Sequence, residues 1–183
     1  LNGVLTYGRI TREVNWRSLG PRAWPYIVQS GGITVDDGAT LTIEAGTTVE
    51  FHGGTGMRIA GTLAIRGEAA NKVVLRGGEA EPRPGQWADI DFQAGSTAYS
   101  STTDTGCIID HAVIEFGGNK QTGAIVIRGS SPRIANSLIR HSGSRAITVS
   151  GDSAHPTIAG NVFDANTNDP NGIGVFATGS ALP

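Results

Sequence analysis

Cysteine is almost absent from this chain of 183 residues, since Cys107 is its single example. One cysteine excludes an intrachain disulfide and any metal site built from several cysteines. Charged residues are also scarce, at 16% of the chain, and the net charge is only −2. The lysines are limited to Lys72 and Lys120 and the arginines are scattered, so no basic stripe is available for a phosphate backbone. We therefore expect no nucleic-acid partner.

Long apolar runs are missing as well. No stretch of about 18 or more apolar residues occurs, so we expect no membrane insertion. The first ten residues lack a basic segment followed by an apolar one, so a secretory signal is either absent or already removed. A hydrophobic fraction of 38% with a small net charge nevertheless excludes a disordered chain. The length fits one folded domain.

Glycine is in excess, with 27 examples, and the apolar residues recur in short groups. From residue 33 the chain runs in triplets with apolar residues on both sides of a middle residue that is often polar. This alternation is typical of a strand with one buried face. The first triplets begin at Ile33, Leu41, Val49 and Met57, eight residues apart.

The second half of the chain shows a longer period. The segment that begins at Ile109 recurs at Ile134 and again at Ile158, which are shifts of 25 and 24 residues. Three eight-residue units make one such period, so we predict coils of three short strands that stack into three parallel sheets around one core. No segment keeps the apolar spacing of an amphipathic helix, which excludes helical repeats.

This pattern resembles the right-handed parallel β-helix proteins, a group that includes pectate lyases and many secreted or surface proteins of bacteria. The resemblance is carried by Pro25–Val28, Ile33–Val35, Gly38–Phe51, Gly61–Leu63, Pro84–Trp87 and Val113–Gly118. It implies an all-β, right-handed, single-stranded parallel β-helix with three parallel sheets and about six coils. It also implies a secreted or cell-surface location in a bacterium. Because this fold carries many functions, it implies no single activity.

The spacing also predicts which residues stack on one another. Residues 1–30 are expected to form an N-terminal cap and residues 31–183 the solenoid, as one domain, with the last coil left uncapped. The predicted first column is Thr34, Arg58, Asp91, Val126, Thr148 and Gly174; the second is Leu41, Leu63, Cys107 or Ile109, Ile134 and Ile158; the third is Val49, Val73, Ile114, Ile139 and Phe163.

The most concentrated polar cluster is predicted on the outward face of the first column. Asp89 and Asp91 lie two residues apart on one strand, so both point the same way at about 6.6 Å. Arg58 is expected one layer away, Arg128 near the layer on the other side, and Trp87 where the strand begins. These five residues are the candidate ligand-binding site. The alternative is an exposed ladder of opposite charges with no ligand.

Two carboxylates in this arrangement are candidates for Ca²⁺ binding or for an acid–base pair, with arginine binding an acidic sugar. Pectate lyases and polygalacturonases would require more, namely clustered aspartates with a basic residue, or three aspartates with a histidine. This chain supplies neither set, so Asp89 and Asp91 are only catalytic candidates. The insertions at residues 76–86 and 93–106 flank their strand, and a catalytic cleft requires both to rise as walls around it.

We therefore expect a non-catalytic extracellular or cell-surface module that acts as a rigid spacer, an adhesin or a glycan-binding surface. The alternative is a carbohydrate-active enzyme, either a polysaccharide lyase or a glycoside hydrolase, or a remnant of one, acting on an acidic polysaccharide. Ca²⁺ at Asp89 and Asp91 is the one cofactor considered. The expected partners are a polysaccharide, or another protein at the last coil, including end-to-end self-association.

Other polar residues are predicted to be structural. His111, Asn136, Gly160 and Asn161 are expected to stack at the corner between the second and third columns. Glu115, Arg140 and Asp164 are expected to alternate in charge along the third column. Two turns, Asp36–Gly38 and Asn168–Asn171, are weak calcium candidates. We expect Cys107 to face the core as a small apolar residue.

Overall fold

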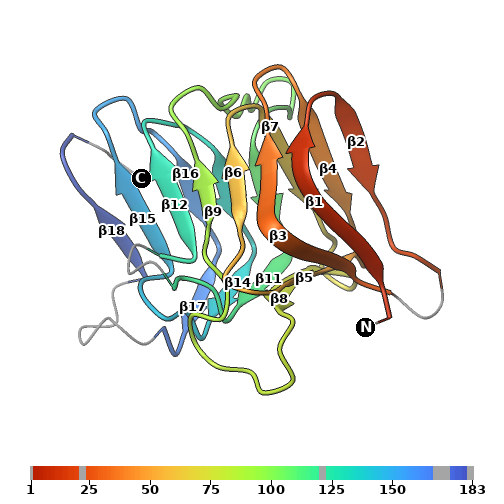
Figure 1. Ribbon diagram of the computed structural model, residues 1–183. Coiled ribbons are helices and arrows are strands. Elements are labelled where there is room, and N and C mark those ends of the chain that lie inside the picture. Colours follow the sequence, from red (N-terminus) through yellow and green to blue (C-terminus); the bar gives the residue numbers. More distant parts are fainter. Residues whose placement is uncertain (1, 21–23, 120–122, 167–173, 181–183) are drawn as a thin grey trace.

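The computed structural model describes residues 2–20, 24–119, 123–166 and 174–180. These residues form short β-strands that pair in parallel and wind into a solenoid of about six coils (Figure 1). None of the residues in these ranges forms a helix long and apolar enough to cross a membrane. The sequence prediction of an all-β parallel solenoid is confirmed.

Each coil contributes one strand to each of three faces, called here the three sheets, although the first and third are continuous through the long strand β3. The strands of the first sheet lie at the front in Figure 1. The first sheet contains the second half of β3 (Tyr26–Val35), then β6 (Met57–Ile59), β9 (Ile90–Phe92), β12 (Ile125–Arg128), β15 (Ile147–Ser150) and β18 (Val175–Ala177). The second contains β2 (Glu13–Trp16), β4 (Thr40–Glu44), β7 (Thr62–Arg66), β10 (Ile108–Asp110), β13 (Arg133–Ala135) and β16 (Thr157–Ala159). The third contains the first half of β3, then β5 (Thr48–Phe51), β8 (Val73–Gly77), β11 (Ala112–Glu115), β14 (Leu138–Arg140) and β17 (Val162–Asp164).

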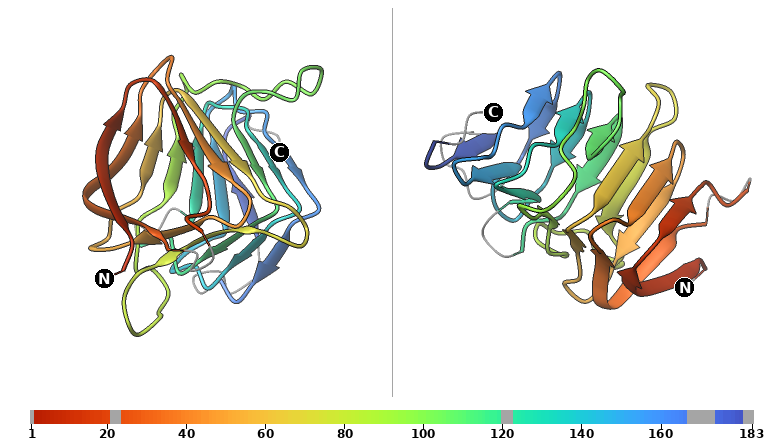
Figure 2. Two further views of the ribbon diagram at one scale, coloured as in Figure 1. Left: turned by 90° about the vertical axis from the view of Figure 1, so that its right-hand side faces the viewer. Right: turned by 90° about the horizontal axis from the view of Figure 1, so that it is seen from above.

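The coils wind in a right-handed sense. Seen from the end that holds β1 (Val4–Ile10), the chain rises along the first sheet, crosses to the second and returns through the third while it recedes (Figure 2). Parallel neighbours cannot be joined by a tight hairpin, because the chain must first return to the end where the strand began. In a solenoid the two other sheets provide that return.

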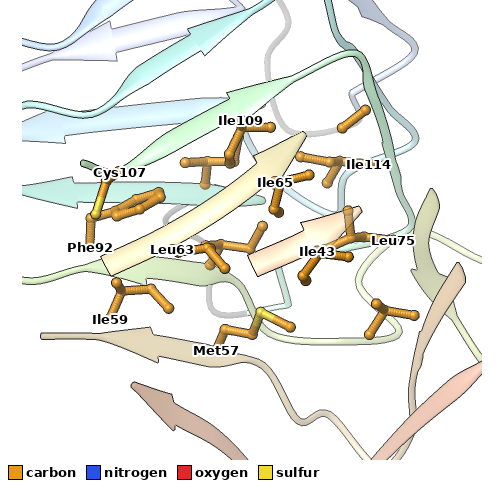
Figure 3. Close-up of a cluster of buried hydrophobic side chains, with 14 of the residues drawn as sticks. Ile43, Met57, Ile59, Leu63, Ile65, Leu75, Phe92, Cys107, Ile109 and Ile114 are labelled. Carbon is orange, nitrogen blue, oxygen red and sulfur yellow. The ribbon is translucent and has the colours of Figure 1, made fainter. Parts of the chain in front are cut away.

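The core fills the space between the three sheets. Inward residues of the first sheet stack layer on layer, and Ile90, Ile125 and Ile147 are paired in register and fully buried. The second and third sheets supply further inward side chains, among them Ile65, Ile109 and Ile114 in Figure 3. Cys107 lies among them, as the sequence predicted. Burial raises the pKa of its thiol, so Cys107 serves as an apolar core residue.

Each of the three predicted columns contains one shift of two residues. In the second sheet Ile109, Ile134 and Ile158 stack on Ile65, and not on the predicted Leu63, which pairs with Leu41. In the third sheet Leu75, and not Val73, pairs with Val49 and Ile114, although both side chains are buried. In the first sheet Phe176, and not Gly174, pairs with Thr148. Neighbouring inward positions have the same apolar character, so a shift of two residues preserves the alternation and leaves the spacing ambiguous.

The strands begin earlier than the predicted boundary at residue 30. β1 pairs in parallel with both halves of β3, and β2 pairs in parallel with β4. Trp16, at the end of β2, is buried and stacks on Tyr26 with ring centroids 4.7 Å apart. Residues 4–16 therefore add one strand to the edge of each adjoining sheet.

The predicted corner between the second and third sheets is present. His111, Asn136 and Gly160 have φ values of 50°, 50° and 65°, so one residue in the left-handed region turns the chain in three successive coils. The side chain of Asn161 then links two coils, because it accepts a hydrogen bond from the Ser137 amide at 3.0 Å and donates one to a carbonyl at 2.8 Å. These bonds satisfy backbone groups that the sheets leave unpaired.

We expect an Ile125→Asp substitution to abolish folding. The side chain is fully buried between Ile90 and Ile147, and an unpaired carboxylate there costs several kcal/mol. Thermal unfolding followed by circular dichroism measures the effect. Thr34→Asp, on the outward side of the same sheet, is the control and should unfold close to the wild-type temperature. A cooperative, near-native transition for Ile125→Asp would contradict the assignment of the core.

Candidate functional site

An open groove of about 370 Å³ crosses the start of the first sheet over three layers of the solenoid. β3, β6 and β9 place Thr34, Arg58 and Asp91 in register at this groove. Asp89, two residues before Asp91, lines it as well. The structure therefore brings Arg58, Asp89 and Asp91 to one groove, but Asp89 is buried and not exposed on the outward face beside Asp91 as predicted.

The groove is hollow because two outward positions carry no side chain. Gly32 and Gly56 occupy successive layers, and Asp89 is the equivalent residue of the next layer. A Cβ at Gly32 would lie 2.4 Å from the Gly56 carbonyl oxygen, and one at Gly56 would lie 2.5 Å from the Asp89 carbonyl oxygen. The close approach of the coils thus excludes side chains, and the floor of the groove beside Arg58 is main chain.

The charged side chains of the groove differ in exposure. Arg58 is exposed, whereas Asp89 is 4% exposed. Asp91 accepts a hydrogen bond at 3.0 Å from Nε of Arg128, the fourth predicted site residue, which lies beside the groove. An ion pair between partly exposed groups contributes about 0 to 1 kcal/mol. The pair orients Asp91 and leaves Arg58 as the exposed cation of the groove.

Trp87 requires a correction. Its side chain is fully buried, its ring lies 4.4 Å from that of Phe51 in a stacked arrangement, and its Nε1–H donates to the Glu115 carbonyl at 2.8 Å. The indole presents no face to a ligand, so Trp87 does not belong to the candidate ligand-binding site in which the sequence analysis placed it. Burying the large apolar indole in the core lowers the free energy of the folded chain more than exposing it to water does.

The two insertions lead away from the groove. Residues 78–86 project beside the third sheet, below β8 in Figure 1, and their hollow is lined by third-sheet residues. Residues 93–106 cross the corner to the second sheet, where Thr97 accepts a hydrogen bond from Thr62 at 2.8 Å. The lining of the groove includes no residue of either segment. Neither insertion therefore forms a wall of a cleft around Asp89 and Asp91.

No group of three or more His, Cys, Asp or Glu side chains with the geometry for a metal ion occurs in the described residues. Calcium at Asp89 and Asp91 stays a prediction that rests on two carboxylates. In the turn at residues 36–38, Asp36 forms an ion pair with Arg9 at 2.8 Å. The turn at residues 168–171 lies outside the described ranges.

The second sheet carries a polar network that the sequence did not predict. Arg66 on β7 binds Asp104 through its side chain at 2.8 Å and through the main-chain carbonyl at 2.5 Å. Tyr99 donates its phenol hydrogen to the same carboxylate at 2.9 Å, and the Arg133 guanidinium lies 5.8 Å from the Tyr99 ring centre. Since Arg66 and Asp104 are 38 residues apart, no local spacing marks the pair.

The network continues to the corner of the sheet. Asp110 accepts hydrogen bonds from Arg133 at 2.5 Å and from Asn136 at 2.9 Å, and His111 Nδ1 lies 2.8 Å from the same carboxylate. Partial burial opposes ionisation of Asp110, but these bonds outweigh it and keep its pKa below the usual value. The network fastens the insertion at residues 93–106 to β7 and, through Arg133, to β13.

Exposed large hydrophobic side chains lie only at the two ends of the part of the solenoid that the structure describes. Val4, Leu5, Tyr7 and Trp24 are at the β1 end, and Val162 is at the β18 end. A hollow of about 350 Å³ at the β18 end is lined by Ile158, Phe163 and Val175, among others. The sides of the solenoid are polar by comparison.

The chain matches no protein-family model, no curated protein and no solved structure. The fold is therefore known from the structure alone, and the chemistry of its surface is the only guide to function.

We expect Tyr99 to titrate at a higher pH than a free tyrosine. Its hydrogen bond to Asp104 and the negative charge of that carboxylate both disfavour the phenolate and raise the Tyr99 pKa. An Asp104→Asn substitution should bring the pKa of Tyr99 back toward 10.0. NMR titration of the Tyr99 ring measures the change, with Asp37→Asn, in an exposed turn, as the control. Identical titration of Tyr99 in wild type and Asp104→Asn would mean that the hydrogen bond does not form in solution.

Proposed function

We propose that this protein is a non-catalytic, extracellular or cell-surface module that binds an acidic glycan in the groove of the first sheet. The groove with its exposed Arg58 is the observation that carries the proposal. A guanidinium binds a carboxylate through paired, charge-assisted hydrogen bonds, the contact that a uronic acid or another acidic sugar offers. The main-chain floor of the groove supplies further polar partners.

A rigid solenoid suits this role. Its groups are held by layers that pair in register, so a ligand meets side chains whose positions are already fixed, and less entropy is lost on binding. The secreted or surface location and kinship to the pectate-lyase-like β-helix proteins belong to the same proposal. Both rest on the sequence resemblance and on the parallel solenoid.

The alternative function is a polysaccharide lyase or glycoside hydrolase, or a remnant of one, that acts on an acidic polysaccharide. Such an enzyme encloses its substrate, whereas neither insertion contributes to the groove at Asp89 and Asp91. Asp91 is also engaged by Arg128. These two observations favour binding over catalysis.

The test is binding to a panel of immobilised neutral and acidic polysaccharides, with Ca²⁺ and with a chelator. We expect retention on acidic polysaccharides, weakened about tenfold by Arg58→Ala, since loss of one charge-assisted contact costs about 1.5 kcal/mol or more. Arg12→Ala, an exposed arginine outside the groove, is the matched control.

Three results would change the proposal. Equal retention of wild type and Arg58→Ala would remove the groove as the site. Loss of retention in an Asp89→Ala, Asp91→Ala double variant together with a calcium requirement would place Ca²⁺ there. New reducing ends or unsaturated products in the bound polysaccharide would support the enzyme instead.

End-to-end association of two copies is a separate prediction from the apolar ends. We expect sedimentation velocity to show larger species as concentration rises, and Leu5→Glu to abolish them. Thr40→Glu on the side of the second sheet should have no effect. A monomer at every concentration would contradict this prediction.

A further inference from the structure

The groove at Arg58 is continuous with a second hollow, of about 360 Å³, at the corner between the first and third sheets. Both are lined by the same three residues, Gly31, Gly53 and Thr55. Gln29 and Ser30, where β3 bends, and His52, just after β5, complete the lining of the second hollow. One ligand can therefore occupy the groove and the corner hollow together.

The corner hollow differs from the groove in its chemistry. Among the described residues that line it, none is an Asp, Glu, Lys or Arg. The side chains of Gln29 and Ser30 form no hydrogen bond with the residues that the structure describes, which leaves an amide and a hydroxyl group for a ligand. Both groups donate and accept hydrogen bonds, as the hydroxyl groups of a sugar do. The corner hollow is therefore complementary to a neutral sugar.

Tyr7 lies beside the corner hollow, on the neighbouring strand β1. Thr6 pairs with Val28 and Gly8 pairs with Ile33, so residues 29–32 of β3 bulge out opposite Tyr7 alone. Figure 1 shows β1 running alongside β3 through this bend. Because residues 29–31 line the hollow, Tyr7 borders it from the next layer of the solenoid.

The ring of Tyr7 lies on the outward side of its strand. Its two neighbours pair with the buried Val28 and Ile33, and side chains alternate along a strand, so Tyr7 takes the opposite side. The residue is 61% exposed, although burial of an aromatic ring is favourable. An exposed ring beside a polar hollow offers a flat apolar surface to the face of a sugar ring.

Tyr7 and Arg58 are too far apart to contact the same sugar ring. β1, β3 and β6 are successive neighbours, so two spacings of about 4.8 Å, or about 9.6 Å, separate the two residues along the solenoid. Arg9 occupies on β1 the position that Arg58 has on β6, but Asp36 binds it at 3.1 and 2.8 Å. Of these two arginines, Arg58 is therefore the one available to a carboxylate.

We propose that the ligand is a linear glycan in which acidic and neutral sugars alternate, and that Tyr7 binds the neutral sugar. This inference rests on the proposed function, because Arg58 binds the carboxylate of the acidic sugar. The neighbouring sugar fills the corner hollow, donates and accepts hydrogen bonds at Gln29 and Ser30, and packs the apolar face of its ring on Tyr7. A chain with a carboxylate on every sugar would bring a second negative charge to a hollow that supplies no cation.

The experiment is an NMR titration of the isotopically labelled full chain with glucuronic acid, a hyaluronan tetrasaccharide and tetragalacturonic acid. The hyaluronan tetrasaccharide alternates glucuronic acid with N-acetylglucosamine, whereas every sugar of tetragalacturonic acid is acidic. We expect the hyaluronan tetrasaccharide to bind about tenfold more tightly than either other probe, and to shift the amide signals of Gln29, Ser30 and Gly53. Equal affinity for tetragalacturonic acid, or shifts confined to the surroundings of Arg58, would overturn the proposal.

Variants of β1 isolate the role of the aromatic ring. Tyr7→Ala should weaken binding of the hyaluronan tetrasaccharide about threefold to tenfold and leave binding of glucuronic acid unchanged. Tyr7→Phe keeps the ring and should bind as wild type. Leu5→Ala, which removes another exposed apolar side chain of the same strand, is the matched control and should also bind as wild type.

The outcomes separate this inference from the function on which it rests. Unchanged tetrasaccharide affinity in Tyr7→Ala, together with weaker binding in Arg58→Ala, would overturn the role of Tyr7 and leave the acidic-glycan function standing. An equal loss in Leu5→Ala would assign the effect to the β1 end as a whole and also overturn the role of Tyr7. Failure of the wild type to bind any of the three probes, with no retention on acidic polysaccharides, would overturn both.

Discussion

In-register parallel pairing between successive coils is the constraint on which the rest of this structure depends. Each inward side chain lies on its counterpart in the previous coil, as Ile125 lies on Ile90 and below Ile147. A strand buried against the core on one side has no freedom to slip by one residue, because its apolar and polar faces would exchange. Polar groups are therefore confined to the corners and to the outward faces. Residues that could contact a ligand are therefore expected at the corners and on the outward faces.

The outward faces are organised layer by layer by the same pairing. Glu50 pairs in register with Arg76, and Glu115 with Arg140, so opposite charges meet across neighbouring strands. Such pairs contribute little to stability when exposed, but like charges in register would repel, so alternation helps to specify the register. Hollows on the outward faces form where this regularity is interrupted. One interruption is a pair of missing side chains beside Arg58, and the other is the loop that lifts away after β8.

The periodic parts of the molecule are predictable from sequence, and the irregular parts are not. Spacings of eight and about 24 residues identify the coils, and two-residue alternation identifies inward positions such as Ile125. The same alternation cannot distinguish Val73 from Leu75 as the partner of Val49, because both are apolar and both are buried. Trp87 and the bond between Arg66 and Asp104 depend on how long insertions return to the coil, and no repeat constrains that path.

Corner residues show how the backbone requirement of the fold can be separated from the packing of a side chain. Every third-sheet corner from β11 to β17 takes a left-handed residue, and the chain fills these positions with Phe116, His141 and Ala165. Glycine or asparagine meets the backbone requirement at less cost, so the phenyl group is not explained by the turn. Phe116 does stack on His141, with ring centroids 5.2 Å apart, and this contact recovers part of the cost.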